Sequence, residues 1–126
     1  MDTIANMLTS IRNAQAVKKE TVKVPYSKFK SELAEVLNGL GFISAVGRGG
    51  KKEKKYLEIT LKYNDGQGAI SQLKRISKPG QRLYSGFADF RWPRGAILIV
   101  STPKGLMTGE QAKKNKLGGE LICLIS

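Results

Sequence analysis

The sequence contains no histidine and only one cysteine, and these two scarcities exclude several kinds of active site. Without histidine there is no imidazole for acid–base catalysis, no Ser-His or Cys-His nucleophile pair, and no histidine-containing zinc site. Cys123 has no partner for an intramolecular disulfide and lies in the apolar run 121–125. We therefore expect a small buried residue at this position, a reducing compartment, and no metal ion or other cofactor.

Long apolar runs are also missing. The wholly apolar stretches, such as 96–100, are far shorter than the ~20 residues of a membrane-spanning helix. The first residues, Met1 to Ile4, do not combine a basic region with an apolar one, as a secretory signal would. We expect no membrane partner and a location in the cytoplasm, or in an organelle of bacterial origin.

Acidic side chains are scarce relative to basic ones. The 126 residues include 22 Lys and Arg against 10 Asp and Glu, a formal net charge of +12. Residues 1–63 and 64–126 each contribute +6, so the excess is not confined to a basic tail. This distribution predicts a polyanionic partner that lies against folded surface.

Hydrophobic periodicity predicts the order α-β-α-β-β in the first half. The expected elements are a helix over 4–16 capped by Asp2 or Thr3, a strand over 21–25, a helix capped by Ser27 and ended by Gly39 and Gly41, and strands over 42–46 and 56–63. The basic, glycine-rich stretch 48–55 has the composition of a hairpin turn. Its simplest interpretation is an exposed loop that keeps the protein soluble.

Turn-forming residues at 64–68 indicate a boundary between two lobes, an α/β lobe over 1–65 and a mainly β lobe over 66–126 with one short helix. The fold class is therefore α+β. In the second lobe we expect a strand over 69–77, a turn at Lys78-Pro79-Gly80, and an extended piece over 81–85 with Arg82 and Tyr84 on one face. A strand over 96–100 follows. The chain then forms a helix from Gly109 to about Lys116, which begins with a Thr108/Gln111 capping box and is closed by Gly118 and Gly119, and it ends in a strand over 120–125.

Two segments of the second half have the composition of a nucleic-acid contact. Residues 87–94 are aromatic and basic, which suits either stacking on bases or packing between the lobes. Residues 101–108 form an expected loop at a strand end, with two hydroxyls, the cation of Lys104, free backbone amides, and Gly105 to permit close approach. Hydroxyls and amides suit RNA, and motifs of DNA-binding proteins are absent, so RNA is favoured.

Ser101-x-x-Lys104 also has an enzymatic interpretation. The spacing matches the signature of penicillin-recognising acyl enzymes, in which the lysine activates the serine. Those enzymes require a longer chain and further motifs that this sequence lacks, and Pro103 disfavours a helical nucleophile turn. The glycine-rich stretch 47–52 also lacks the spacing of a nucleotide-binding loop. No catalytic residue is predicted.

Taken together, the motifs resemble those of the bacterial-type small-subunit ribosomal protein eight family over essentially residues 1–126. The similar stretches are 2–14, Val24-Pro-Tyr-Ser-Lys-Phe-Lys30, Ser77-Lys-Pro-Gly-Gln-Arg-Leu-Tyr84, Ser101-Thr-Pro-Lys-Gly-Leu-Met-Thr108 and Leu117-Gly-Gly-Glu-Leu-Ile-Cys123. Two departures accompany the match. Residues 87–95 differ from the family's usual Leu-Pro stretch with spaced glycines, and Pro103 replaces a small polar residue, which removes one amide donor.

The resemblance implies a two-lobe, non-catalytic protein of the small ribosomal subunit that binds the central domain of small-subunit ribosomal RNA and supports subunit assembly and translation. Neighbouring ribosomal proteins are implied partners, and some family members also repress their own messenger RNA. A free-standing RNA-binding regulator on the same scaffold is the alternative. The implied RNA-binding residues are Ser101, Thr102, Lys104, Gly105, Thr108, Arg82, Tyr84, Gly118, Gly119 and Glu120 in the second lobe, and Arg12, Asn13, Lys28 and Lys30 in the first.

Overall fold

A computed structural model describes residues 3–78 and 80–126. The described chain forms two compact units, an N-terminal unit over 3–70 and a C-terminal unit over 71–126. The mixture of helices and antiparallel sheets confirms the predicted α+β class. The division falls after Ile70, whereas the turn composition placed it after residue 65. The predicted cap at Asp2 and the Pro79 position of the predicted turn lie outside the described residues.

The N-terminal unit follows the predicted order and adds one small hairpin. Its elements are α1 (Thr3–Ala16), β1 (Thr21–Pro25), α2 (Lys28–Gly39), β2 (Ile43–Gly49), β3 (Tyr56–Leu61), β4 (Tyr63–Asn64) and β5 (Gln67–Gly68). The cluster at 64–68 is thus not a linker between lobes. It closes the β4–β5 hairpin, with Asp65 and Gly66 both at positive φ (53° and 81°), as a two-residue hairpin turn requires.

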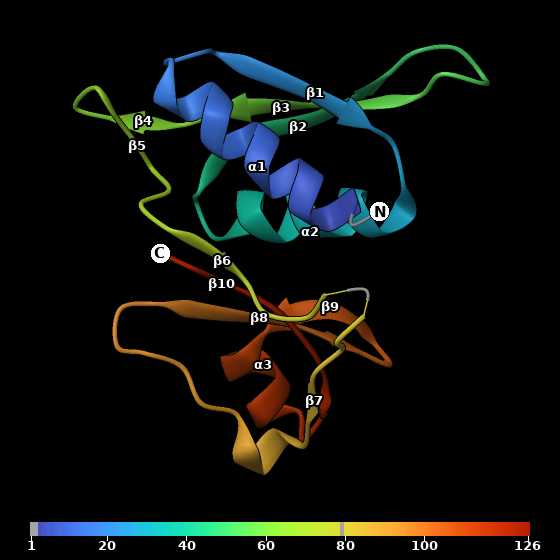
Figure 1. Cartoon of the computed structure of the whole chain (residues 1–126), viewed down its shortest axis with the longest axis vertical. Coiled ribbons are helices and arrows are strands. Elements are labelled where there is room, and N and C mark those ends of the chain that lie inside the picture. Colours follow the sequence, from blue (N-terminus) through green and yellow to red (C-terminus); the bar gives the residue numbers. More distant parts are fainter. Residues whose placement is uncertain (1–2, 79) are drawn as a thin grey trace. The chain divides into compact units, whose positions relative to one another are not determined.

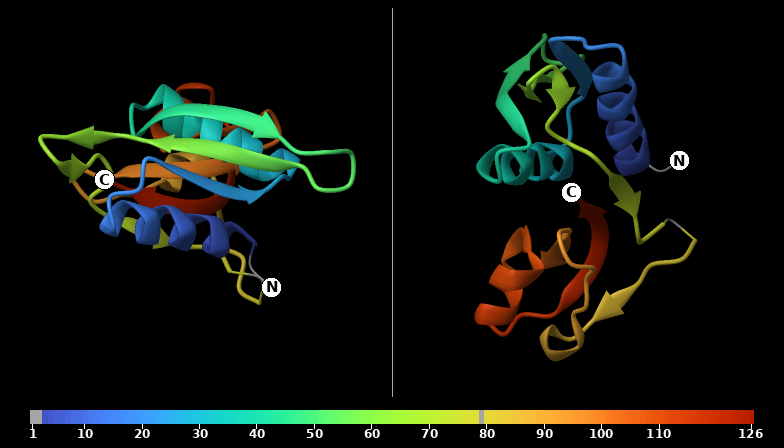
Figure 2. Two further views of the ribbon diagram at one scale, coloured as in Figure 1. Left: turned by 90° about the horizontal axis from the view of Figure 1, so that it is seen from above. Right: turned by 90° about the vertical axis from the view of Figure 1, so that its left-hand side faces the viewer.

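The core of this unit lies between a three-stranded antiparallel sheet and its two helices. The strand order is β1-β3-β2, and along β3 the side chains of Leu57, Ile59 and Leu61 are buried on one face, as predicted. Both helices lie on that side of the sheet, and the view from above shows the opposite face uncovered by either helix (Figures 1 and 2). At the start of α2 the Ser27 hydroxyl accepts a hydrogen bond from the Lys30 N–H at 3.1 Å, which confirms the predicted cap.

The C-terminal unit is built on a sheet of order β6-β10-β8-β9, with β7 paired to β10 as well (Figure 1). Its elements are β6 (Leu73–Arg75), β7 (Tyr84–Ser85), the 3₁₀ turn η1 (Phe87–Asp89), β8 (Ile97–Thr102), β9 (Gly105–Thr108), α3 (Gly109–Lys114) and β10 (Gly119–Ile125). Two predictions here were wrong. The expected strand over 69–77 contracts to β6, and the expected loop over 101–108 is a β-hairpin in which only Pro103 and Lys104 lie outside the strands.

The aromatic residues of segment 87–94 belong to the core of their own unit. Phe90 is buried with Leu98 and Val100 of β8, and Phe87 and Trp92 pack against the same cluster. The Lys113 ammonium lies 5.7 Å from the centre of the Trp92 ring, a cation–π distance. These contacts favour core packing over base stacking as the role of the aromatic residues. The packing is within one unit, whereas the sequence suggested packing between the two lobes.

No helix in the described part of the chain is long and apolar enough to be a membrane span.

Candidate nucleic-acid interface

Glu120 lies at the centre of the predicted site because β10 pairs with a different strand on each side. Its partner in β8 is Ser101, and its partner in β7 is Tyr84. Residues directly opposite each other in antiparallel strands point to the same face of the sheet, so these three side chains share one face. The neighbouring pair Leu121 and Val100 points to the other face, where both pack in the core cluster beside α3. The polar row therefore faces away from α3.

Gly119 lets the strands that carry this row approach closely. A Cβ on Gly119 would overlap the carbonyl oxygen of Ser101. A Cβ on Gly118 would lie 2.8 Å from the carbonyl oxygen of Ser85. Neither position tolerates a side chain without a shift of backbone, so both predicted site glycines have a structural reason to be glycine, in addition to any ligand they contact.

The β8–β9 turn presents Lys104 at its tip. The Thr102 hydroxyl donates to the Gly105 carbonyl at 2.8 Å and accepts from the Lys104 N–H at 3.2 Å, and Thr102 itself is buried. Gly105 has φ +115°, a conformation that favours glycine. Pro103 occupies the turn position at which its fixed φ suits a β-turn. Thr102 and Gly105 thus hold the turn, and Lys104 is exposed on it.

The hydroxyls of Ser101 and Thr108 differ in how they are used. Thr108 caps α3, because its hydroxyl accepts from the Gln111 N–H at 3.1 Å while the Gln111 side chain accepts from the Thr108 N–H at 3.2 Å. This confirms the predicted capping box, and it occupies the Thr108 hydroxyl. The half-buried Ser101 hydroxyl makes no hydrogen bond to any residue that the structure describes. Ser101 is therefore the hydroxyl that remains available to a ligand.

Ser77 also supports the site, although the sequence predicted no role for it. Its buried hydroxyl accepts from the Leu83 N–H at 2.9 Å and lies 3.3 Å from the Leu83 carbonyl oxygen. The main chains of Lys78 and Gln81 bond each other inside the loop thus closed. The Leu83 carbonyl also accepts from the Leu121 N–H, which ties the loop to β10. This clamp positions Arg82 and Tyr84, and its only signal in the sequence is the serine at the start of the 77–84 stretch.

Arg82 joins the row through a contact with Glu120, and the side chains of Arg82 and Tyr84 are both exposed. Tyr84 is 68% exposed, an unusual value for a large aromatic side chain. One guanidinium nitrogen of Arg82 lies 3.4 Å from each carboxylate oxygen of Glu120, and the Arg82 side chain is 60% exposed. Glu120 pairs with Tyr84 and contacts Arg82, which is consistent with the predicted placement of Arg82 and Tyr84 on one face.

The four predicted residues of the first lobe lie on two helices of the N-terminal unit. Arg12 and Asn13 are exposed on α1, and Lys28 is exposed in the first turn of α2. Lys30 is buried, and burial lowers the pKa of its ammonium because desolvation disfavours the charged form. The Lys28 ammonium is therefore accessible to a phosphate, whereas the Lys30 side chain is buried.

The C-terminal row combines groups that suit RNA. The exposed ring of Tyr84 offers stacking, Arg82 and Lys104 offer positive charge, and Ser101, which lies opposite Glu120 in the sheet, offers a free hydroxyl. Among the residues described, no group of three or more His, Cys, Asp or Glu side chains has metal-binding geometry.

Comparison with known proteins places this chain in a family. The family model described as Ribosomal protein S8 matches residues 2–126. The protein named small ribosomal subunit protein uS8 from Rippkaea orientalis is 47% identical, with 98% of this chain and 96% of that protein covered. Proteins of the same name from Ruthia magnifica and Bordetella petrii are 45% and 43% identical, with 98% and 99% of this chain and 96% and 97% of theirs covered.

These matches decide between the interpretations of the Ser101 segment. The family is one of structural ribosomal proteins rather than enzymes, so the acyl-enzyme interpretation of Ser101 and Lys104 is set aside. The match extends over the whole described chain and includes both units, as the sequence resemblance indicated. The chain belongs to the ribosomal protein S8 family and is a protein of the small ribosomal subunit.

Proposed function

We propose that this protein binds the central domain of small-subunit ribosomal RNA directly and thereby helps the subunit to assemble. The observation that carries the proposal is the strand register that aligns Tyr84, Glu120 and Ser101 on one face of the C-terminal sheet. Strand pairing fixes these side chains relative to one another before any ligand arrives. A surface organised in advance loses less conformational entropy on binding than a mobile basic loop does.

Each residue of the row has a distinct role in the proposal. Lys104 and Arg82 contact phosphates, which supplies affinity without sequence information. Ser101 hydrogen-bonds a 2′-hydroxyl or a base edge, and Tyr84 stacks on an unpaired base, which supplies discrimination. Thr102, Thr108 and the glycines 105, 118 and 119 maintain the geometry on which those contacts depend.

Glu120 limits the positive charge at the centre of the row. A carboxylate repels phosphates, so RNA that merely seeks a basic surface gains less here than RNA whose shape fits the row. The paired Arg82 keeps further N–H donors for a phosphate, because a guanidinium has five. The arrangement favours selective over general binding.

The N-terminal unit contributes exposed polar and charged side chains to the same RNA in this proposal. Arg12, Asn13 and Lys28 lie on its helices and contact phosphates of a second RNA segment. Neighbouring small-subunit ribosomal proteins are expected partners within the assembled particle. Repression of the protein's own messenger RNA stays a prediction.

The experiment is a filter-binding titration of the full chain against a central-domain ribosomal RNA fragment and a scrambled RNA of equal length, at two salt concentrations. Binding to the genuine fragment that persists at the higher salt, while the scrambled RNA is released, supports the proposal. Equal binding to both RNAs, lost together as salt rises, contradicts it, because a basic surface alone produces that pattern.

A further inference from the structure

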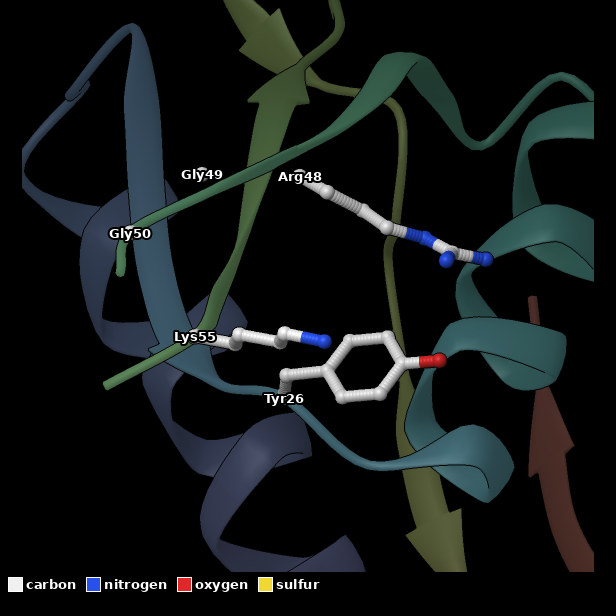
Figure 3. Close-up of a pocket in the computed structure, with 5 residues that line it drawn as sticks. All are labelled: Tyr26, Arg48, Gly49, Gly50 and Lys55. Atoms are coloured by element: carbon white, nitrogen blue, oxygen red, sulfur yellow. The ribbon is translucent and has the colours of Figure 1, made fainter. Parts of the chain in front are cut away.

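The N-terminal unit has a basic pocket that none of the predicted RNA-binding residues lines. Its volume is about 190 Å³, and its lining residues are Tyr26, Arg48, Gly49, Gly50 and Lys55. The pocket lies where the β2–β3 hairpin passes the segment between β1 and α2. Figure 3 shows the side chains of Arg48, from β2, and of Lys55, from the residue just before β3, both extending above the Tyr26 ring.

Backbone bonds and glycines fix the shape of this pocket. The Tyr26 N–H donates to the Lys55 carbonyl at 3.1 Å, which joins the β1–α2 segment to the hairpin. Gly50 has φ +93°, and a Cβ there would overlap the carbonyl oxygen of Lys54. A Cβ on Gly49 would overlap the ring of Tyr56. Gly49 and Gly50 line one wall of the pocket, and the close contacts of their backbone leave no room for a side chain at either position.

The cations of the pocket have no acidic partner in the part of the chain that the structure describes. The Arg48 guanidinium carbon lies 5.1 Å from the centre of the Tyr26 ring, so the ring face holds the guanidinium plane by a cation–π contact. That contact leaves the N–H edges of Arg48 open to a ligand. No salt bridge within residues 3–78 and 80–126 involves Arg48 or Lys55.

The neighbouring turn strengthens the positive potential. Lys51, Lys52 and Lys54 are all exposed beside the pocket, and Glu53 is the one acidic residue of the 48–55 stretch. An arginine fork beside a lysine ammonium matches the charge and geometry of a phosphate group. A ring that holds the arginine reduces the rotamer entropy lost when the ligand binds.

We propose that the pocket formed by Tyr26, Arg48 and Lys55 binds a phosphodiester group of RNA, as a second anchor separate from the row around Glu120. The inference rests on the proposed function for the identity of the polyanion. The pocket assigns to the 48–55 stretch a binding role beyond that of a solubilising loop. Arg48 donates to two phosphate oxygens, and Lys55 supplies the second positive charge.

The test compares two double variants that remove the same charge from the same hairpin. R48Q/K55Q alters the pocket, and K51Q/K52Q alters the neighbouring turn. Each full-length variant is titrated with the central-domain ribosomal RNA fragment over a range of salt concentrations. We expect the pocket variant to bind on the order of ten-fold more weakly, with a log–log salt slope flattened by about one to two, and the turn variant to change clearly less.

A second pair of variants tests the aromatic ring without changing the charge. Tyr26→Phe keeps the ring beneath Arg48 and is expected to bind like the unaltered chain. Tyr26→Leu removes the ring, so Arg48 loses its support and the affinity is expected to fall several-fold. Circular dichroism and the urea midpoint of unfolding verify that each variant is folded.

The outcomes separate this inference from the proposed function. If the unaltered chain selects the genuine fragment but the two double variants weaken binding equally, the pocket is not a phosphate site and only general charge acts there. Unchanged binding by R48Q/K55Q likewise overturns the pocket while the proposed function stands. Failure of the unaltered chain to prefer the genuine fragment contradicts the proposed function itself, whatever the variants do.

Discussion

The guanidinium of Arg82 lies 3.4 Å from both carboxylate oxygens of Glu120, on the sheet face that also carries Tyr84 and Ser101. The two residues differ in exposure, because the Glu120 side chain is 14% exposed and that of Arg82 is 60% exposed. A carboxylate at the centre of a basic protein's binding row is thus neutralised from the solvent side. This relationship makes Glu120 a residue of selectivity in the proposed complex.

Replacement of Glu120 by Gln is expected to weaken RNA discrimination more than it weakens stability. An ion pair with an exposed partner contributes less than about 1 kcal/mol, so the urea midpoint changes little. Loss of the carboxylate removes a repulsion that acts mainly on phosphates bound over the row without the matching shape, so binding to scrambled RNA rises toward that of the genuine fragment. Parallel filter-binding titrations of both RNAs measure the ratio. An unchanged ratio contradicts a selective role for Glu120.

Ser101 and Ser77 form a matched pair for separating binding from stability. Ser101→Ala removes a hydroxyl without a partner in the described structure, so discrimination is expected to fall by about 1 kcal/mol while stability stays unchanged. Ser77→Ala leaves the Leu83 N–H without its acceptor inside a buried clamp, which costs about 1–3 kcal/mol of unfolding free energy. Urea denaturation and RNA titration of both variants provide the comparison. Equal destabilisation by the two changes is incompatible with these roles.

Local sequence signals predicted most helices and strands of this protein, because their causes lie within a few residues. The Ser27 cap and the Thr108/Gln111 capping box both follow from side chains and amides three positions apart. The alternation at Leu57, Ile59 and Leu61 likewise reflects a single strand with one buried face. The β4–β5 hairpin was missed although Asp65-Gly66 is a hairpin signal, because the same composition also marks linkers.

The candidate site was harder to predict, because its geometry depends on strands that are distant in the sequence. Arg82 and Tyr84 could be placed on one face from their spacing, but their contact with Glu120 depends on the pairing of β7 with β10. The loop expected over 101–108 became a hairpin because Leu106 and Met107 pair with β8, a register that periodicity over four residues does not reveal. Lys30 was expected to contact RNA, and tertiary packing buries it.

Cys123 is expected to be unreactive in the native state and to make stability depend on alkaline pH. Burial raises the pKa of its thiol to about 12, and nearby Arg75 opposes part of that rise. An unfolded thiol titrates near pH 8.5, so above that pH the unfolded chain releases a proton that the folded chain keeps. Stability is therefore lost as pH rises from about 8.5 toward 12, with a slope of up to ~1.4 kcal/mol per pH unit.

The measurement for Cys123 compares the unaltered chain with Cys123→Ala. Urea unfolding from pH 7 to pH 11 should show a steeper decline for the unaltered chain, and the difference between the two curves isolates the thiol from lysine and tyrosine titration. A chromogenic disulfide reagent at pH 8 should label the native thiol slowly and the unfolded thiol at once. Rapid labelling of the native protein contradicts the buried, protonated state.

Gly119→Ala is expected to damage both the fold of the C-terminal unit and RNA binding, because a methyl group at this position meets the Ser101 carbonyl. Separation of β10 from β8 would weaken the strand pairing and move Ser101 away from Glu120, at an overpacking cost of about 1–3 kcal/mol. Gly80→Ala is the control, since its Cβ would meet nothing within 4 Å. Unfolding midpoints and binding to the central-domain fragment are measured for both variants. If the two variants change the unfolding midpoint and the RNA affinity equally, glycine at position 119 is not needed for the close approach of β8 and β10. The register argument for the binding row then loses its support.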